Sequence, residues 1–337
     1  MIKEAIQTLV SGKSLTMEEA ASVMGEIMQG GATLAQLGAF LTALRIKGET
    51  TEEIIGLAKT MRSKAVPVKV TGSVVDTCGT GGDGLHTFNI STAAAFVAAG
   101  AGLKVAKHGN RAASSQCGSA DVLETLGVKI ELNAEQVQKC LEEVGMGFMF
   151  APLFHPAMKH AAVPRREIGI RTVFNIIGPL TNPAGAMAQV LGVADESLVE
   201  KMALVLQGLG CHHALIVHGE DGLDEITVTG KTQVCELKNG SITSYFISPG
   251  DFGLPLAGLD SLEGGALDKN ASLLRGILGG AQGPQRDVVL MNAAAALVAG
   301  DRVKTLKEGI ALAGKVVDEG RALAKLEQLI RFSQAQA

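Results

Sequence analysis

The sequence predicts a two-part α/β protein, with a small helical domain over residues 1–66 and a larger α/β domain over residues 73–337. Helix start and stop signals dominate the first part. From residue 73, short apolar segments alternate with glycine-containing loops and helical stretches, which is typical of a mainly parallel central sheet covered on both faces. The chain of 337 residues is also 47% hydrophobic, which is ample for a large core.

The helices of the first domain are indicated by their ends. Thr16 with Glu19, and Thr50 with Glu53, have the capping-box spacing, in which each side chain satisfies the backbone N–H of the other residue. Gly48 stands where a helix should end. Between these positions, apolar residues recur at three- and four-residue intervals, so each helix should bury one face.

The second domain is predicted to contain strands of two kinds. Four apolar segments, each followed by a loop and a helix, should form parallel strands: residues 73–76, 103–107, 189–193 and 214–218. Three later segments, separated by Thr229-Gly230-Lys231 and Asn239-Gly240, should add antiparallel ribbons: residues 225–228, 233–237 and 244–247. Residues 285–335 return to an Ala- and Leu-rich helical pattern.

Composition excludes several classes of function. A net charge of -4 and an aromatic content of 3%, with no Trp, argue against a nucleic-acid partner. The longest apolar run is too short to span a bilayer, and Glu4 interrupts any secretory leader, so we expect no membrane partner and a cytoplasmic location. The five cysteines lack any CxxC spacing and should be reduced thiols.

The strongest functional signal follows the first predicted strand. Residues 76–84 hold four glycines, whose backbone N–H groups can approach an anion without interference from a Cβ atom. The run is not a Walker loop, because no Gly-Lys-Ser/Thr follows the glycines. Ser91 and Thr92 then precede an Ala-rich helix, whose N-terminus favours anions. A structural turn followed by a plain N-cap is the other interpretation, but the two segments together favour a phosphate-binding loop.

A basic loop follows the next strand. Lys107 and Arg111 supply cationic donors at the carboxyl end of a parallel strand, which is where open α/β sheets bind their ligands. Two phosphate-binding loops would then share one edge of the sheet. A solvated basic turn is the alternative, and His108 alone is more typical of an internal hydrogen-bonding group than of a catalyst.

Two further clusters are ambiguous when taken alone. Residues 220–225 are acidic; next to a polyphosphate, Asp224 and Glu225 would require a divalent cation, and elsewhere they would form a solvated turn. Arg165 and Arg166 lie after a helical stretch, and an arginine fork can bind a planar carboxylate at two points. Arginines also cap helices and pair with glutamate, so the residue types alone do not show whether Arg165 or Arg166 binds a ligand.

Taken together, these motifs resemble those of the anthranilate phosphoribosyltransferase family. The resemblance covers nearly the whole chain and rests on residues 79–83, 89–92, 107–111, 118–121, 171–175, 178–183 and 224–225. It implies a phosphoribosyltransferase fold of the nucleoside-phosphorylase-like type. It also implies that a helical segment around residues 156–180 joins the small domain, and that two chains pair through this domain as a homodimer.

The resemblance implies a reaction of tryptophan biosynthesis. The phosphoribosyl group of 5-phosphoribosyl 1-pyrophosphate (PRPP) would pass to the amine of anthranilate, with pyrophosphate released. The implied anthranilate contacts are Gly79, Asn110 and Arg165, and the implied Mg²⁺ ligands are Ser91, Asp224 and Glu225. The implied PRPP contacts are Gly79, Gly82, Asp83, Thr87, Asn89, Ser91, Thr92, Lys107, His108, Gly109, Asn110, Arg111, Ser115 and Ser119.

Elementary chemistry agrees with this reaction. The arylamine of anthranilate has a free lone pair at neutral pH, so making the nucleophile needs no strong base. We therefore assign no general acid or base, and expect catalysis by positioning and electrostatic stabilisation of the leaving group.

Two alternatives remain at this stage. Pyrimidine nucleoside phosphorylases also act at a ribose C1, but their second loop usually reads Lys-His-Ser followed by Gly-Gly, whereas residues 107–111 here read Lys-His-Gly-Asn-Arg. A non-catalytic nucleotide-binding paralogue is the other, and the net charge of -4 and the Asp224-Glu225 pair count against it. Within the transferase interpretation, a broader specificity for aromatic acids is also open.

Overall fold

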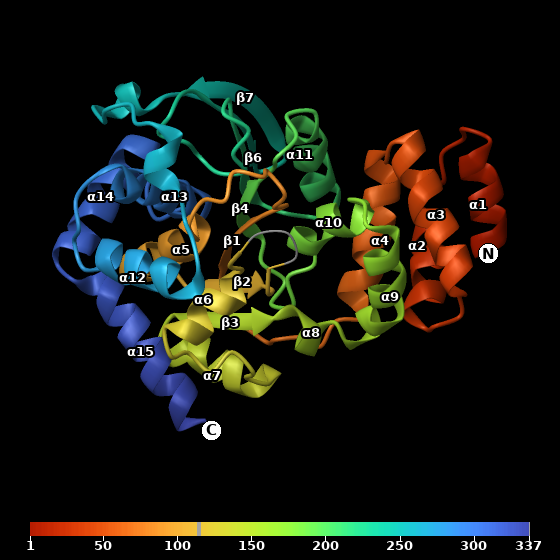
Figure 1. The fold of residues 1–337 in the computed structure, drawn as a ribbon, viewed down its shortest axis with the longest axis horizontal. Helices are drawn as coiled ribbons and strands as arrows, with labels where there is room; N and C mark the ends of the chain where they lie inside the picture. The colour runs from red at the N-terminus through yellow and green to blue at the C-terminus, as the bar shows by residue number, and fades with distance from the viewer. Residues whose placement is uncertain (113–115, 337) are drawn as a thin grey trace.

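The computed structural model describes residues 1–112 and 116–336 (Figure 1). The N-terminal helices form one end of the molecule, the strands lie in the middle, and the C-terminal helices form the other end.

Four helices form the N-terminal part: α1 (Ile2–Val10), α2 (Met17–Met28), α3 (Leu34–Lys47) and α4 (Thr51–Ser63). The capping boxes at Thr16 and Thr50 are both confirmed. A third box, at Thr33 before α3, was not predicted. Gly48 ends α3 with a φ of 85°, a conformation that favours glycine.

Helices from the middle of the chain pack against this bundle. They are α9 (Lys159–Ile168) and α10 (Val173–Ile177). The same stretch of chain also contains α8 (Ala151–Phe154) and the short 3₁₀ turns η1 (Pro156–Met158) and η2 (Gly178–Leu180). Helix α9 contacts α2 and α3, and α10 contacts α3 and α4. In Figure 1 these green helices lie beside the red and orange N-terminal ones.

The sheet has seven strands in the order β3-β2-β1-β4-β5-β6-β7. They are β1 (Val75–Gly79), β2 (Val105–Gly109), β3 (Met146–Phe150), β4 (Ala188–Gly192), β5 (His213–Gly219), β6 (Thr232–Lys238) and β7 (Ser241–Ile247). The first five in this order are parallel, and β6 and β7 are antiparallel. The strand order reverses between β1 and β4, the position at which open α/β sheets bind ligands.

Two strand predictions require correction. Strand β3 was missed because its sequence, Met-Gly-Phe-Met-Phe, contains none of the β-branched residues that are typical of strands. The strand predicted over 225–228 is wrong. The backbone N–H and C=O of Ile226 bond to the side chain of Asn292, and the N–H of Thr227 bonds to Thr232 Oγ1. Side chains therefore satisfy this segment in place of a neighbouring strand.

Helices cover both faces of the sheet. The remaining ones are α5 (Ile90–Gly100), α6 (Ser119–Thr125), α7 (Ala134–Glu143), α11 (Leu198–Gly208), α12 (Leu267–Leu278), α13 (Pro284–Ala299), α14 (Leu306–Asp318) and α15 (Arg321–Ala335), with 3₁₀ turns η3 (Pro249–Phe252) and η4 (Leu259–Leu262). Helices α5 and α13 share one apolar cluster with one face of the sheet. A second cluster runs from the N-terminal bundle through α10 and α11 to the opposite face.

Two compositional predictions can be compared with the structure. In the part of the chain that it describes, no helix combines the length and the apolar character that crossing a membrane requires. All five cysteines are free thiols, as predicted.

Candidate active site

The predicted loops meet at the carboxyl edge of the parallel strands. Residues 79–83 leave β1, residues 109–111 leave β2, and the acidic turn at 220–225 leaves β5. The backbone N–H of Gly81 donates to Asp224 Oδ2 at 2.7 Å, which joins the first loop to the third. The N–H of Ser91, in the first turn of α5, donates to Glu225 Oε1 at 3.2 Å.

Glycines make room for the buried carboxylate of Asp224. Gly79 on β1 pairs with Gly192 on β4. A Cβ on Gly79 would overlap the Asp224 side chain, and a Cβ on Gly192 would overlap the Asp224 carbonyl group. Two neighbouring strands therefore lack side chains where the acidic turn lies against them.

The acidic pair has the character of a cation site. Burial, reinforced by the charge of Asp83, raises the pKa of Asp224, and burial reinforced by Asp224 raises the pKa of Glu225. Each carboxylate is thus costly to ionise unless positive charge is bound. Among residues 1–112 and 116–336, no three His, Cys, Asp or Glu side chains form a complete metal cage. Mg²⁺ usually takes only one or two protein carboxylates and completes its shell with water and substrate phosphates, so this donor set fits it.

A buried lysine lies beside this pair. Lys107 Nζ donates to the Thr77 carbonyl at 2.6 Å and lies 3.5 Å from Ser91 Oγ. Burial raises the pKa of Asp76 to about 6, although the charge of Lys107 opposes this rise. The same charge opposes the rise in the pKa of Glu225. The structure thereby brings Lys107 and Ser91 together, as the sequence predicted for two loops on one edge.

Other predicted PRPP contacts lie around the same edge. Asn89 Nδ2 donates to the Cys117 carbonyl at 3.0 Å, and its buried Oδ1 has no hydrogen-bond partner within the described chain. Ser119 Oγ donates to the Asn110 carbonyl at 3.4 Å. A Cβ on Gly109 would overlap Ser119 Oγ, so the second loop packs closely on the start of α6.

Four of the predicted PRPP contacts have protein partners or surroundings that the sequence did not show. Arg111 forms ion pairs with Asp121 and Glu124 and is exposed. Thr92 is buried within α5, and Thr87 forms an antiparallel bridge with Glu263. His108 lines the cavity described next. Ser115 lies outside the described residues.

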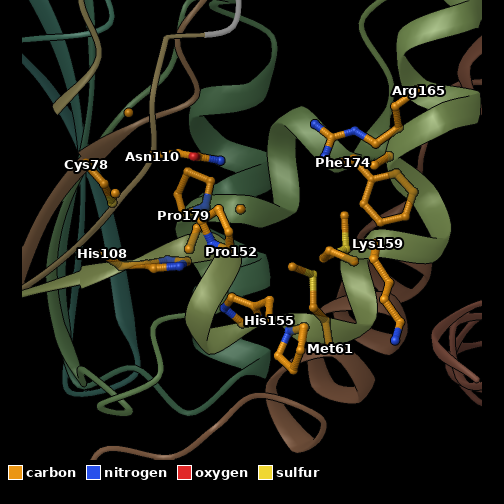
Figure 2. Close-up of a pocket in the computed structure, with 17 residues that line it drawn as sticks. Met61, Cys78, His108, Asn110, Pro152, His155, Lys159, Arg165, Phe174 and Pro179 are labelled. Atoms are coloured by element: carbon orange, nitrogen blue, oxygen red, sulfur yellow. The ribbon is translucent and has the colours of Figure 1, made fainter. Parts of the chain in front are cut away.

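A cavity of about 450 Å³ opens beside these loops, within the size range of small-molecule sites. All three predicted anthranilate contacts, Gly79, Asn110 and Arg165, line it. In Figure 2, Cys78, His108 and Asn110 lie on one side of the cavity, and Arg165, Phe174 and Lys159 lie on the other. Gly79 belongs to both the glycine loop and the cavity wall, so the two sites are adjacent.

Arg165 is the partly buried cation of this cavity, whose wall also carries the exposed Lys159. Its guanidinium carbon lies 5.1 Å from the centre of the Phe174 ring, and desolvation lowers its pKa. No carboxylate within the described chain comes close enough to form an ion pair with it. An unpaired, partly buried guanidinium favours an anionic ligand. The structure thus distinguishes Arg165 from the exposed Arg166, which the residue types alone did not.

Two histidines on the cavity wall are neutral. The rings of His108 and His155 lie 5.0 Å apart. Burial lowers the pKa of His108 to about 3 and that of His155 to about 4. Both Nε2 atoms are buried without a hydrogen-bond partner in the described part of the chain. Sequence reasoning missed His155, because a single histidine at a helix end gives no chemical pattern until the fold sets it beside His108.

Comparison with known proteins identifies the family. The glycosyl transferase family matches in two parts, its helical bundle domain over residues 3–65 and its a/b domain over residues 71–323. The anthranilate phosphoribosyltransferase of Dehalococcoides mccartyi is 59% identical over 339 residues, covering 100% of this chain and 99% of its own. The chain belongs to the anthranilate phosphoribosyltransferase family. The enzyme of Chloroflexus aurantiacus is also 59% identical, covering 99% of both chains.

Solved structures of anthranilate phosphoribosyltransferases share this fold. That of Thermus thermophilus has a TM-score of 0.93 at 45% identity, covering 98% of this chain and 99% of its own. The Saccharomyces cerevisiae enzyme, in complex with PRPP and Mg, has a TM-score of 0.90 at 31% identity, covering 99% and 98%. The predicted fold class, a small helical domain with a larger, mainly parallel α/β domain, is confirmed.

Proposed function

We propose that the protein transfers the phosphoribosyl group of PRPP to the amine of anthranilate in tryptophan biosynthesis. The products are N-(5-phosphoribosyl)anthranilate and pyrophosphate. One observation carries the proposal beyond family membership. A cavity with an unpaired cation, Arg165, shares Gly79 with a loop edge that holds Lys107 and a buried carboxylate pair. An aromatic acid and a polyphosphate can therefore bind side by side.

The donor would bind along the carboxyl edge. Apart from those of Gly81 and Ser91, which donate to the acidic pair, backbone N–H groups of the glycine loop and the start of α5 suit phosphate oxygens. Lys107 adds a buried charge. The unpartnered Oδ1 of Asn89 is an acceptor suited to a ribose hydroxyl. The full proposed set is Gly79, Gly82, Asp83, Thr87, Asn89, Ser91, Thr92, Lys107, His108, Gly109, Asn110, Arg111, Ser115 and Ser119.

We propose Ser91, Asp224 and Glu225 as the residues that hold Mg²⁺. Bound there, Mg²⁺ would offset the negative charge of the pyrophosphate. The raised pKa values of Asp224 and Glu225 support this assignment, because a cation makes both carboxylates easier to ionise. The S. cerevisiae relative with Mg supports the choice of metal.

The acceptor would bind with its carboxylate at Arg165 and its ring against Phe174. Breaking the C1–O bond of PRPP leaves positive charge on the ribose, and the amine lone pair forms the new N–C1 bond. The neutral His108 and His155 add no positive charge to the cavity wall, and the arylamine itself is unprotonated at neutral pH. Catalysis then rests on positioning and on stabilising the leaving group, with no general base.

The proposal also covers the two domains, the pairing of two chains and the location of the enzyme. The small domain comprises residues 1–66 with the joining segment around 156–180, and the donor-binding domain comprises residues 73–337. Two chains pair through the helical domain, and the exposed apolar side chains of Val10, Leu34 and Ile46 support this surface. The enzyme acts in the cytoplasm.

The test follows anthranilate fluorescence in the purified protein. Loss of the signal should require both PRPP and Mg²⁺. The double variant Asp224→Asn, Glu225→Gln should abolish it, whereas the matched control Glu142→Gln, Glu143→Gln, an exposed adjacent pair on α7, should not. PRPP binding without anthranilate loss would contradict the acceptor, and phosphorolysis of a pyrimidine nucleoside would favour a phosphorylase.

A further inference from the structure

Arg171 occupies a position at the junction of the two domains to which the proposed site assigns no role. It follows Gly169, which ends α9 with a φ of 68°, and precedes α10, which begins after Thr172. The residue is exposed, so its side chain is free to meet a ligand from solvent. The chain turns sharply here and directs Arg171 back towards the sheet edge.

The guanidinium of Arg171 lies on the glycine loop. Nη2 donates to the Thr80 carbonyl at 3.2 Å. Gly82 has a φ of 75°, and a Cβ built there would overlap Nη1 of Arg171. The arginine therefore fills the space that a side chain at position 82 would occupy, in the middle of the proposed phosphate-binding loop.

The charges around Arg171 leave it available for an anion. Gly82, on which it lies, follows Gly81, whose N–H donates to Asp224, and the charge of Arg171 opposes the rise in the pKa of that carboxyl group. No carboxylate in the described ranges lies within ion-pair distance of it. By contrast, Arg111 is held by Asp121 and Glu124. Of the five N–H donors of Arg171, the structure commits one, to the Thr80 carbonyl.

We propose that Arg171 is a further catalytic residue, which binds the pyrophosphate leaving group of PRPP. The inference rests on the proposed function. When the C1–O bond breaks, its electron pair stays on the pyrophosphate oxygen. The amine lone pair closes the N–C1 bond, and the amine gives one proton to water. A guanidinium with unused donors on the glycine loop stabilises the negative charge that develops on the departing oxygen.

The experiment measures binding of the leaving group and of the sugar phosphate separately. Arg171→Gln and the control Arg166→Gln are compared with the unaltered protein by calorimetry, using pyrophosphate with Mg²⁺ and, separately, ribose 5-phosphate. Arg166 is exposed and lies on α9 a few residues away, so it matches the charge change. Arg171→Gln should bind pyrophosphate about 10-fold more weakly and ribose 5-phosphate unchanged. Arg171→Lys should recover part of the loss, and KM for anthranilate should not change.

Two results would overturn the role of Arg171. One is unchanged pyrophosphate affinity in Arg171→Gln. The other is an equal loss of both ligands, which would mean that the arginine only shapes the glycine loop. If the unaltered protein itself bound no pyrophosphate, the proposed function would fail and the role of Arg171 with it.

Discussion

At the scale of the residue, Arg165 and Arg166 are adjacent in sequence and differ in environment. Arg165 faces the cavity over Phe174, and Arg166 is exposed. Arg165→Gln should raise KM for anthranilate roughly 10- to 100-fold, because a charge-assisted hydrogen bond contributes about 1.5–3 kcal/mol. KM for PRPP should stay within about twofold. Steady-state kinetics of both variants test this, and an equal rise in both constants for Arg165→Gln would refute the acceptor assignment.

The buried histidines give the protein a defined sensitivity to acid. Burial lowers the pKa of His155 to about 4, whereas an unfolded chain binds the proton near pH 6.5. Stability from this group is therefore present above pH ~6.5 and is lost as the pH falls towards 4. His155→Gln should lose less free energy of unfolding between pH 7 and pH 5, by on the order of 1–2 kcal/mol.

Urea unfolding at the two pH values measures this effect. The exposed His212 provides the control, and His212→Gln should follow the pH dependence of the unaltered protein. An identical acid response in His155→Gln would mean that His155 binds a proton as readily in the folded chain as in the unfolded one.

The sequence revealed site residues that occur in runs and missed those that stand alone. Residues 79–83, 107–111 and 220–225 were recognisable because glycines, cations or carboxylates cluster in each. His155 and Arg171 acquire a chemical context only from neighbours far away in sequence, His108 and Gly82. The ion pairs of Arg111 were equally hidden, because Asp121 and Glu124 lie on a helix whose orientation the sequence does not show.

At the scale of the element, Asn292 of α13 holds the acidic turn in place. Its Oδ1 accepts the N–H of Ile226 at 3.0 Å, and its Nδ2 donates to the carbonyls of Ile226 and Val288 at 2.8 and 2.9 Å. Ile226 directly follows Glu225. Helix α13 therefore holds the backbone next to the Asp224-Glu225 pair. The side-chain amide of Asn292 therefore satisfies the backbone N–H and C=O groups that a neighbouring strand would have satisfied.

Asn292→Ala should lower the free energy of unfolding by on the order of 2–4 kcal/mol, because it leaves the buried N–H and C=O of Ile226 unpaired. It should also weaken Mg²⁺ binding. Urea unfolding and Mg²⁺ titration measure the two effects. Gln138→Ala, an amide on the surface of α7, is the control and should change stability by less than about 0.5 kcal/mol. Unchanged Mg²⁺ affinity in Asn292→Ala would show that the Asn292 hydrogen bonds do not support the metal site.

Predictions of helix ends and turns were confirmed where interactions between residues close in sequence determine the backbone. The capping boxes of α2 and α4 are local, and so is the Asn239-Gly240 turn between β6 and β7, where both residues have positive φ. Strand β3 has no β-branched residue, and its pairing with β2 is visible only in the folded sheet. Prediction therefore failed where tertiary context decides the backbone.

At the scale of the whole molecule, the helical bundle and the sheet share one apolar cluster through α10 and α11. Ile177 of α10 is fully buried in this cluster. Calorimetry should therefore show a single unfolding transition, and Ile177→Ala should lower its Tm without splitting it, with a loss of about 2–5 kcal/mol. Thr60→Ala, on the bundle but outside the cluster, should shift it less. Two separate transitions in the unaltered protein would show that the domains unfold independently.

The shared cluster also bears on how the chain is made. Helices α1–α4 leave the ribosome first, but α9 and α10, which pack against them, end only at Ile177. Until that residue emerges, the nascent bundle keeps an apolar face uncovered, and β1 still lacks its neighbour β4. Early synthesis is therefore the interval in which this protein most needs protection by a chaperone, and a chain truncated before α9 should be captured by one.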